Sequence, residues 1–262
     1  MSFLKNIFFP IGKKQKILFG PLQGQKIIIT TNTQWAPIIG RWEPVIQKIL
    51  SRVLEKGNIY YDLGANFGIH GLLAAKKIAQ SGHVYNFEPL PDNIDEINKN
   101  YELNNIYNFT NIKKAVSNVN GVANFNLGSH NTQGSLSNDN VSNNSINVEL
   151  ITLDSFINEG NPFPNFIKMD IEGAEGDALE GYSMHIEKSF PNMIIELHNP
   201  EADKKVGDFL KFYNYDVYRF NSFGKVKFEK IVRLDKPWPN PDGIWGSIFC
   251  INKRTDLKNF QF

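Results

Sequence analysis

The hydrophobic pattern of the chain changes character at Asn58. Downstream, short apolar runs typical of buried strands alternate with stretches whose apolar residues repeat at helical spacing. The predicted strands are 58–63, 83–87, 109–116, 166–169 and 193–197, and the predicted helices are 69–79 and 92–104, with others beginning near Gly173 and Glu201. This alternation favours an α/β fold with a doubly wound, mostly parallel sheet covered by helices on both faces.

The segments on either side of this alternation have different patterns. Before it, a short β-type run at 26–30 is followed by a helix that opens at Glu43-Pro44 and stops at Gly57. After it, the segments 216–219, 225–233 and 247–251 predict antiparallel strands at one edge of the sheet. We therefore divide the chain into a lead-in, 1–57, and a main domain, 58–262, that carries the C-terminal strands. Within the main domain, the polar and Asn-rich stretch 128–145 predicts a long loop, a candidate lid.

Composition narrows the classes of function. The 262 residues include 28 Lys and Arg against 27 Asp and Glu, a net charge of +1. A dedicated nucleic-acid binder would need a basic excess, so we expect no nucleic-acid partner. The single cysteine, Cys250, excludes an internal disulfide and a multi-cysteine metal site.

Membrane and export signals are also missing from the pattern. No apolar run approaches the roughly 20 residues that span a bilayer. Polar residues interrupt the apolar positions of the first 16 residues, whereas a secretory signal has an unbroken apolar region. The sequence therefore predicts a cytoplasmic protein without a transmembrane segment, and it does not indicate an oligomeric state.

A glycine-containing turn joins the first strand of the alternation to its helix. The turn reads D-L-G-A-N-F-G at 62–68, and Glu88 ends the next strand about twenty residues later. A dinucleotide site wants G-x-G-x-x-G, and the third glycine is absent, which argues against a hydride-transferring dehydrogenase. Asp62 before the first glycine suits an amino group, and an acid at Glu88 suits ribose hydroxyls. S-adenosylmethionine carries both groups, and we expect it as the methyl donor.

Two further motifs extend this reading: F-E-P at 87–89 and K-M-D-I-E-G-A-E at 168–175. Together with the turn, they resemble the FkbM-type family of S-adenosylmethionine-dependent methyltransferases. The resemblance implies a Rossmann-like class I methyltransferase fold and methylation of a hydroxyl on a sugar, a glycan precursor or a small metabolite. His70 departs from the family pattern, which commonly has an aromatic or aliphatic residue there.

The resemblance also implies roles for residues at matching positions. The turn would hold the methionine part of the donor, Glu88 its ribose, and the end of the third strand would approach its adenine. The donor-binding residues implied in this way are Asp62, Gly64, Ala65, Asn66, Gly68, Glu88, Ala115, Val116 and Asp170.

Three ionisable residues follow the fourth and fifth strands: Asp170, Glu196 and His198. Ligands of open α/β sheets bind beyond the carboxyl ends of the strands, so these residues are the catalytic candidates. A base would help to remove the proton of a neutral hydroxyl, and His198 can titrate near neutral pH. The same three residues could instead hold a divalent cation that lowers the pKa of the acceptor. The sequence leaves the choice between base and metal open.

The acceptor is expected to be a carbohydrate or another small molecule. Candidate residues on its side of the site are Glu43, Ser135, Glu172, Glu175 and Trp238. Glu172 and Glu175 have a simpler interpretation, because carboxylates stabilise the N-terminus of the helix that follows. Two alternatives remain: a methyltransferase-fold binding protein without turnover, and an N-methyltransferase on another acceptor.

Overall fold

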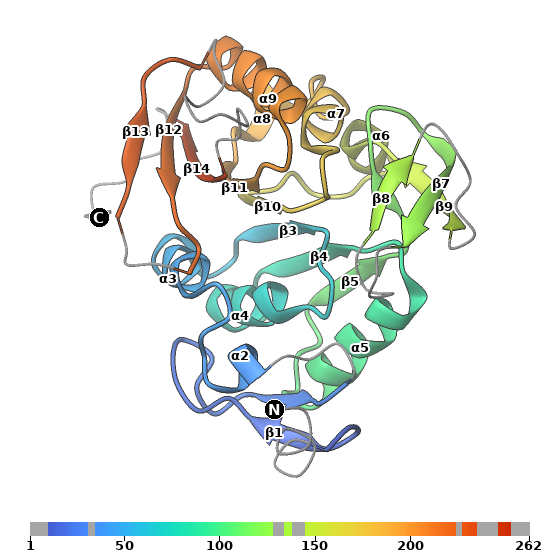
Figure 1. The fold of residues 1–262 in the computed structure, drawn as a ribbon, viewed down its shortest axis with the longest axis vertical. Coiled ribbons are helices and arrows are strands. Elements are labelled where there is room, and N and C mark those ends of the chain that lie inside the picture. The colour runs from blue at the N-terminus through green and yellow to red at the C-terminus, as the bar shows by residue number, and fades with distance from the viewer. Residues whose placement is uncertain are drawn as a thin grey trace.

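The fold is built on one large sheet (Figure 1). The structure, a computed structural model, describes residues 10–30, 35–127, 134–137, 145–223, 227–234 and 246–252. The sheet has eight strands in the order β13-β12-β14-β11-β10-β3-β4-β5. In chain order these are β3 (Ile59–Leu63), β4 (His83–Phe87), β5 (Phe109–Ile112), β10 (Phe166–Met169), β11 (Asn192–Glu196), β12 (Tyr215–Phe220), β13 (Glu229–Ile231) and β14 (Ser247–Asn252).

Strand direction confirms the predicted fold class. The five strands from β11 to β5 run parallel, as expected for strands that alternate with helices. The last strands are antiparallel: β14 pairs with both β11 and β12, and β13 pairs with β12. β14 therefore lies inside the sheet, between two strands that precede it in the sequence.

Helices cover both faces of the sheet. One face carries α3 (Pro44–Val53), α4 (Ile69–Ile78) and α5 (Pro91–Glu102), and the other carries α6 (Leu153–Asn158), α7 (Glu175–Glu180), α8 (Ile186–Ser189) and α9 (Pro200–Phe212) (Figure 1). Each face has its own hydrophobic core, because the side chains of a strand alternate between faces. Tyr60 and Phe166 belong to the α3–α5 side, and Leu63 and Met169 belong to the other.

The register of the parallel strands brings several predicted site residues to one edge of the sheet. Leu63, Phe87 and Met169 end β3, β4 and β10 in one row, which Ile195 of β11 continues. The residue after each of them lies at the carboxyl edge of the sheet. These residues are Gly64, Glu88, Asp170 and Glu196.

A second, smaller sheet corrects two predictions. Its order is β6-β9-β7-β8, formed by β6 (Ala115–Val116), β7 (Gly121–Leu127), β8 (Gly134–Ser137) and β9 (Ser145–Ile151). The predicted strand 109–116 is wrong as one element, because the N–H of Lys114 bonds to the carbonyl of Ile112 in a tight turn that ends β5. The predicted loop 128–145 contains β8, which pairs with β7 through backbone groups that the polar composition does not reveal. The rest of that stretch before Ser145 lies outside the described residues, so its role as a lid stays a prediction.

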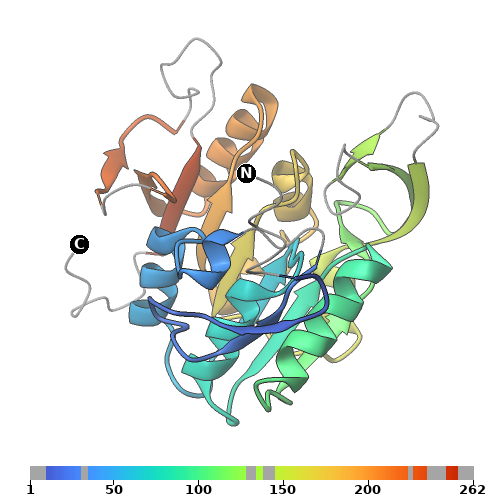
Figure 2. The same ribbon diagram turned by 60° about the horizontal axis from the view of Figure 1, so that its bottom comes forward.

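The lead-in packs against the α3–α5 side of the sheet. It contains the predicted strand as β2 (Lys26–Ile28) and the predicted helix as α3, and it also has β1 (Lys14–Lys16) and α2 (Trp35–Ile38). β2 lies beside α5, where the N–H of Ile28 donates to Oδ1 of Asn100 at 2.9 Å (Figure 2). Ile17 and Leu22 are buried in the same core as α4. The division of the chain after residue 57 stays a prediction.

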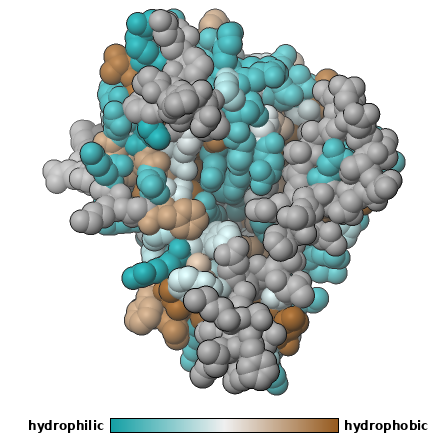
Figure 3. All heavy atoms as spheres, viewed as in Figure 1, coloured by the Kyte–Doolittle hydropathy of each residue, from teal (hydrophilic) through white to brown (hydrophobic). Residues whose placement is uncertain are grey.

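The surface over the lead-in is partly hydrophobic. Figure 3 shows a mostly hydrophilic face whose hydrophobic side chains gather near its lower edge, over the lead-in. The large hydrophobic residues of the lead-in that are exposed include Ile11, Leu18, Phe19 and Trp35. Among the helices that the structure describes, none is both long enough and apolar enough to cross a bilayer.

Candidate active site

A pocket opens at the carboxyl edge of the parallel strands. It has about 1180 Å³ of empty space, its open mouth included. The predicted site residues that line it are Glu43, Gly64, Ala65, Asn66, Glu88, Ala115, Val116, Asp170, Glu172, Glu196 and His198.

The glycines of the turn are needed for close packing of the chain. Gly64 has φ 76°, and a Cβ there would collide with the carbonyl oxygen of Asp170. Gly68 has φ 80° and caps α4, and a Cβ there would lie 2.9 Å from Ile97 and 3.0 Å from Tyr101. Only glycine adopts such positive φ angles at little cost. Gly64 lines the pocket, whereas Gly68 shapes the turn from behind it.

Glu88 lines the pocket and is hydrogen-bonded to the turn. Its Oε2 accepts the N–H of Asn66 at 2.8 Å, and its Oε1 accepts the N–H of Leu90 at 3.0 Å. The side chain is 4% exposed, and burial raises the pKa of its carboxyl to about 7, although these two hydrogen bonds favour the charged form. The side chain of Asn93 also bonds to Glu88, but a carboxylate has about four acceptor positions, so Glu88 can hold these groups and still bind a ligand hydroxyl.

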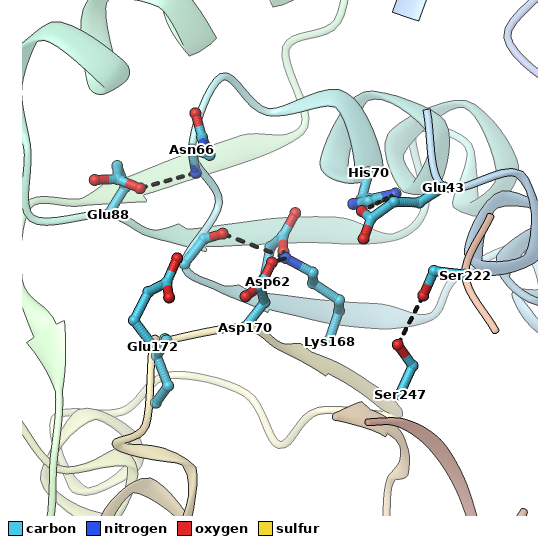
Figure 4. A network of polar contacts seen from close by, with 12 residues as sticks. Glu43, Asp62, Asn66, His70, Glu88, Lys168, Asp170, Glu172, Ser222 and Ser247 are labelled. Carbon is cyan, nitrogen blue, oxygen red and sulfur yellow. Dashed lines mark hydrogen bonds and ion pairs between the residues drawn. The ribbon is translucent and has the colours of Figure 1, made fainter. Parts of the chain in front are cut away.

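Lys168 links the turn to the acidic groups beneath the pocket (Figure 4). Its Nζ lies 3.4 Å from the carbonyl oxygen of Gly64, 3.3 Å from Oδ2 of Asp170 and 3.8 Å from Oδ1 of Asp62. Asp62 is 1% exposed, and neither of its oxygens accepts a well-aligned hydrogen bond from the described residues. Burial therefore raises the pKa of Asp62 to about 6 even though Lys168 opposes the shift. Asp62 lies behind the pocket wall, and Lys168 connects it to the pocket.

His198 lies in a cluster of three carboxyl groups at the other side of the pocket. Its Nδ1 is 2.9 Å from Oε1 of Glu175, and its Nε2 is 3.5 Å from Oδ1 of Asp170 and 3.6 Å from Oε2 of Glu172. Burial lowers the pKa of His198, but these neighbours, above all its hydrogen bond to Glu175, raise it to about 9. The ring of His198 therefore carries a proton at neutral pH in this arrangement.

Glu175 holds this cluster from below. It is fully buried, and its Oε1 also accepts the N–H groups of Ile171 and Gly173 at 3.3 and 3.1 Å. These bonds close the turn after β10, where Glu172 has φ 55° and points its half-exposed carboxylate towards the pocket. Glu175 does not line the pocket.

The same cluster has the composition of a cation site. Asp170, Glu172 and His198 each offer one ligand atom, and these atoms lie within 4.8 Å of one another. Glu196 is not a member, because it faces the α3–α5 side of the sheet whereas His198 follows β11 and faces α7. The set that could hold a divalent cation therefore contains Glu172 in place of the predicted Glu196.

Glu43, one of the predicted acceptor-side residues, completes the pocket. Glu43, 6% exposed, caps α3 with a left-handed backbone, φ 40° and ψ 60°. Its Oε2 lies 3.4 Å from Nε2 of His70, which is 4% exposed in the first turn of α4. Its carboxyl group also interacts with that of Glu196, which lines the same pocket. Figure 4 shows Glu43 and His70 on one side of the network and Glu88 on the other, with Lys168 between them.

Comparison with known proteins identifies the family of this chain. The model of the methyltransferase FkbM domain matches residues 62–220, more than half of the chain. The chain belongs to the FkbM methyltransferase family. This match covers the turn, Glu88 and the motif after β10, as the resemblance in the sequence predicted.

This FkbM chain is similar to several known proteins at low sequence identity. It is 26% identical over 167 residues to the hexuronic acid methyltransferase AglP of Haloferax volcanii, a match that spans 60% of this chain and 63% of the relative. Among solved structures, the methyltransferase FkbM of Methylobacillus flagellatus KT has a TM-score of 0.49 and 18% identity and covers 74% of this chain and 43% of its own. The precorrin-6y C5,15-methyltransferase of Geobacter metallireducens GS-15 has a TM-score of 0.46 and 12% identity, covering 86% and 90%.

For two predicted site residues of the FkbM chain, the structure does not describe the side chain. Ser135 lies in β8, of which only the backbone is described, and Trp238 lies outside the described residues. Conversely, Lys168 lines the pocket but was not among the predicted site residues, although it opens the third motif. A lysine in an otherwise apolar strand was the available signal, because such a residue is buried only with charged partners.

Proposed function

We propose that this protein transfers a methyl group from S-adenosylmethionine to a hydroxyl of a sugar, a glycan precursor or a small metabolite. The observation that carries the proposal is the row formed by Gly64, Glu88, Asp170 and Glu196, which brings a donor-type turn and acidic groups into one pocket. S-adenosylmethionine supplies a methyl group already activated on a sulfonium sulfur. The chain then has to hold the two reactants in line and accept a proton.

The residues at the Glu88 end of the pocket fit the proposed donor. Glu88 offers free acceptor positions to ribose hydroxyls, and the wall around it is mostly apolar, as a purine ring requires. This wall includes Leu90, Ala115, Val116 and Phe125. Asp62 is buried next to the turn, and its carboxylate adds negative charge that favours a cationic ligand nearby, although Lys168 offsets part of that charge.

Donor binding gives the first test. Glu88→Ala should weaken the binding of S-adenosylhomocysteine about tenfold to hundredfold, because a hydrogen bond to a charged group contributes about 1.5–3 kcal/mol. Asp62→Ala should also weaken it, acting through Lys168, which would lose one of its two closest carboxylates. Calorimetry measures both affinities, and Glu102→Ala, an exposed glutamate at the end of α5, is the control. Unchanged affinity in both site variants would refute the donor assignment.

The acceptor end of the pocket is acidic. Glu43, Asp170, Glu172 and Glu196 line it, and the nearby cations are already paired: Lys168 with Asp170, and His198 with three carboxyl groups. An acceptor that brings its own carboxylate would meet like charges. The relative AglP is named for a hexuronic acid. For this chain we propose a neutral acceptor hydroxyl instead.

An acceptor panel tests this charge preference. With labelled S-adenosylmethionine, we expect transfer to neutral glycosides and at least about tenfold less transfer to the matching hexuronides, because juxtaposed like charges cost several kcal/mol. The assay is run before and after chelation and dialysis, and we expect no change. Preference for the hexuronide would contradict the neutral acceptor, and lost activity restored by a divalent cation would favour the metal mechanism. Donor binding without transfer to any acceptor would favour a binding protein.

The base is one of the three predicted residues. The protonated state of His198 at neutral pH favours a carboxylate for this role. Both oxygens of Asp170 already face cations, Lys168 and His198. Glu196 is beside acidic groups, and burial, followed by the charge of Asp170, raises its pKa, which makes it the better proton acceptor of the two.

A further inference from the structure

Glu43 has an unusual backbone conformation and is buried, although glutamate side chains are mostly exposed. It is a non-glycine residue with left-handed backbone angles, a conformation that persists only when its surroundings impose it. Its side chain is buried between two elements of the pocket wall, α4 with His70 and β11 with Glu196. The strained cap therefore directs this carboxyl group into the pocket instead of into solvent.

Charged and titratable groups face Glu43 from each strand beneath it. β10 contributes Lys168 and Asp170, β11 contributes Glu196, and the hydroxyl of Tyr60 on β3 also interacts with it. Burial, followed by Asp170 and Glu196, raises the pKa of Glu43 to about 8 against the opposing effect of Lys168. Burial lowers the pKa of His70 well below its usual value, so that contact joins two neutral groups at neutral pH.

We propose that Glu43 keeps its proton and donates it in a hydrogen bond to Glu196, with His70 fixing Glu43 from behind. One oxygen of Glu196 is then occupied by Glu43, and the other is presented to the acceptor hydroxyl as the base. Glu43 and His70 are positioning residues, and Glu196 is the catalytic one. This assignment rests on the proposed function for the identity of the acceptor, but the proton on Glu43 does not depend on it.

The proposed arrangement balances the reaction. The acceptor hydroxyl gives its proton to Glu196 as its oxygen forms the new bond to the methyl carbon. The carbon–sulfur bond breaks, and its electron pair stays on sulfur, so the donor becomes neutral S-adenosylhomocysteine. Because Glu43 is already protonated, Glu196 releases its new proton through the mouth of the pocket to solvent.

Carbon-13 NMR of protein labelled at the glutamate carboxyl groups tests the protonation of Glu43. In chelator-treated protein we expect one signal that titrates near pH 8, separate from that of Glu88 near pH 7. Glu43→Gln should remove it, and Glu55→Gln, a change at an exposed glutamate after α3, should leave it. Absence of this signal in the wild type, or its survival in Glu43→Gln, would overturn the proposal whatever the acceptor is.

Kinetics test the positioning role. Glu43→Ala should lower kcat about tenfold to hundredfold without changing the Kd of S-adenosylhomocysteine. Glu43→Gln, whose amide still donates to Glu196, should restore most of kcat and remove the fall in kcat that we expect above about pH 8 when Glu43 ionises. His70→Phe should give a smaller loss of kcat. A glutamine variant as impaired as the alanine variant, or one that keeps the alkaline fall, would contradict the proposal, and unchanged kcat in His70→Phe would remove His70 from it.

If the proposed function fails instead, the Glu88 variant will bind S-adenosylhomocysteine normally while the NMR titration still succeeds. The two failures are therefore distinguishable.

Discussion

Replacing Lys168 by methionine should destabilise the fold by about 3–5 kcal/mol and abolish donor binding, because it leaves buried carboxylates without their cation. Lys168 is 4% exposed and Asp62 is 1% exposed, so water cannot replace the ammonium group as a partner of the buried carboxylate. The same ammonium holds the carbonyl group of Gly64, so its loss also frees the turn that we assign to the donor. Urea unfolding and calorimetry with S-adenosylhomocysteine measure the two effects.

The pH dependence of this loss identifies its cause. Burial already raises the pKa of Asp62 to about 6 with Lys168 in place, and removing the cation can only raise it further. A carboxyl whose pKa is raised on folding stabilises the folded state at low pH and loses that contribution as pH rises. The deficit of Lys168→Met should therefore be largest above the raised pKa of Asp62 in the variant, shrink as pH falls towards about 6, and level off below that.

Two control variants accompany Lys168→Met. Adding Asp62→Asn should restore part of the stability, because the uncompensated charge is gone. Lys205→Met removes an exposed lysine that lies 3.0 Å from Asp177, and it should change the free energy of unfolding by no more than about 1 kcal/mol. A Lys168 variant no less stable than the Lys205 variant would mean that the buried network is not what holds the turn.

Replacing Glu196 by glutamine should lower kcat by about 10²–10⁴, the range contributed by a positioned base, without changing donor affinity. Glutamine keeps the shape of the side chain and can still bond to Glu43, but its amide cannot take up a proton. Single-turnover transfer to the best acceptor of the panel separates this chemical step from product release. Glu187→Gln, an exposed change in α8, is the matched control.

The acid side of the pH profile gives a second readout for Glu196. Because its pKa is raised, wild-type kcat should fall as pH is lowered and Glu196 becomes protonated. Near-normal kcat in Glu196→Gln would move the base to Asp170 or His198. In that case the hydrogen bond from Glu43 would have a structural role only.

Much of the fold could be predicted because its signals are local. The apolar run of β3, the helical spacing of α4 and the turn between them are each contained in a few consecutive residues, and β3 and α4 were found within a residue or two. A strand at 122–127, the position of β7, was predicted, but β8 was missed because it is short and polar and pairs with β7 through its backbone. No pattern of side chains in the sequence indicates such a backbone pairing.

The site also contains residues with a local sequence signal and residues that only tertiary packing brings together. Gly64, Glu88 and Asp170 could be predicted because each follows an apolar strand directly, and the ends of parallel strands meet at one edge. His70 was noted only as an exception to the family pattern. Its partner Glu43 is 27 residues away in sequence, and their 3.4 Å contact depends on how α3 and α4 pack on the sheet. Such contacts between distant polar residues follow from tertiary packing, which periodicity does not encode.

The position of β14 bears on the order in which the protein folds. β11, which carries Glu196 at its end, has β10 on one side and β14 on the other, and Glu196 itself pairs with Ser247. During synthesis on a ribosome, the strands β3 to β11 emerge before β14 has been made. Until then, the backbone groups of β11 that later pair with β14 are unpaired and can bind another chain. The base proposed for catalysis therefore gains its final support only after residues 247–252 have been synthesised, and changes in this last strand should act on folding yield and on kcat together.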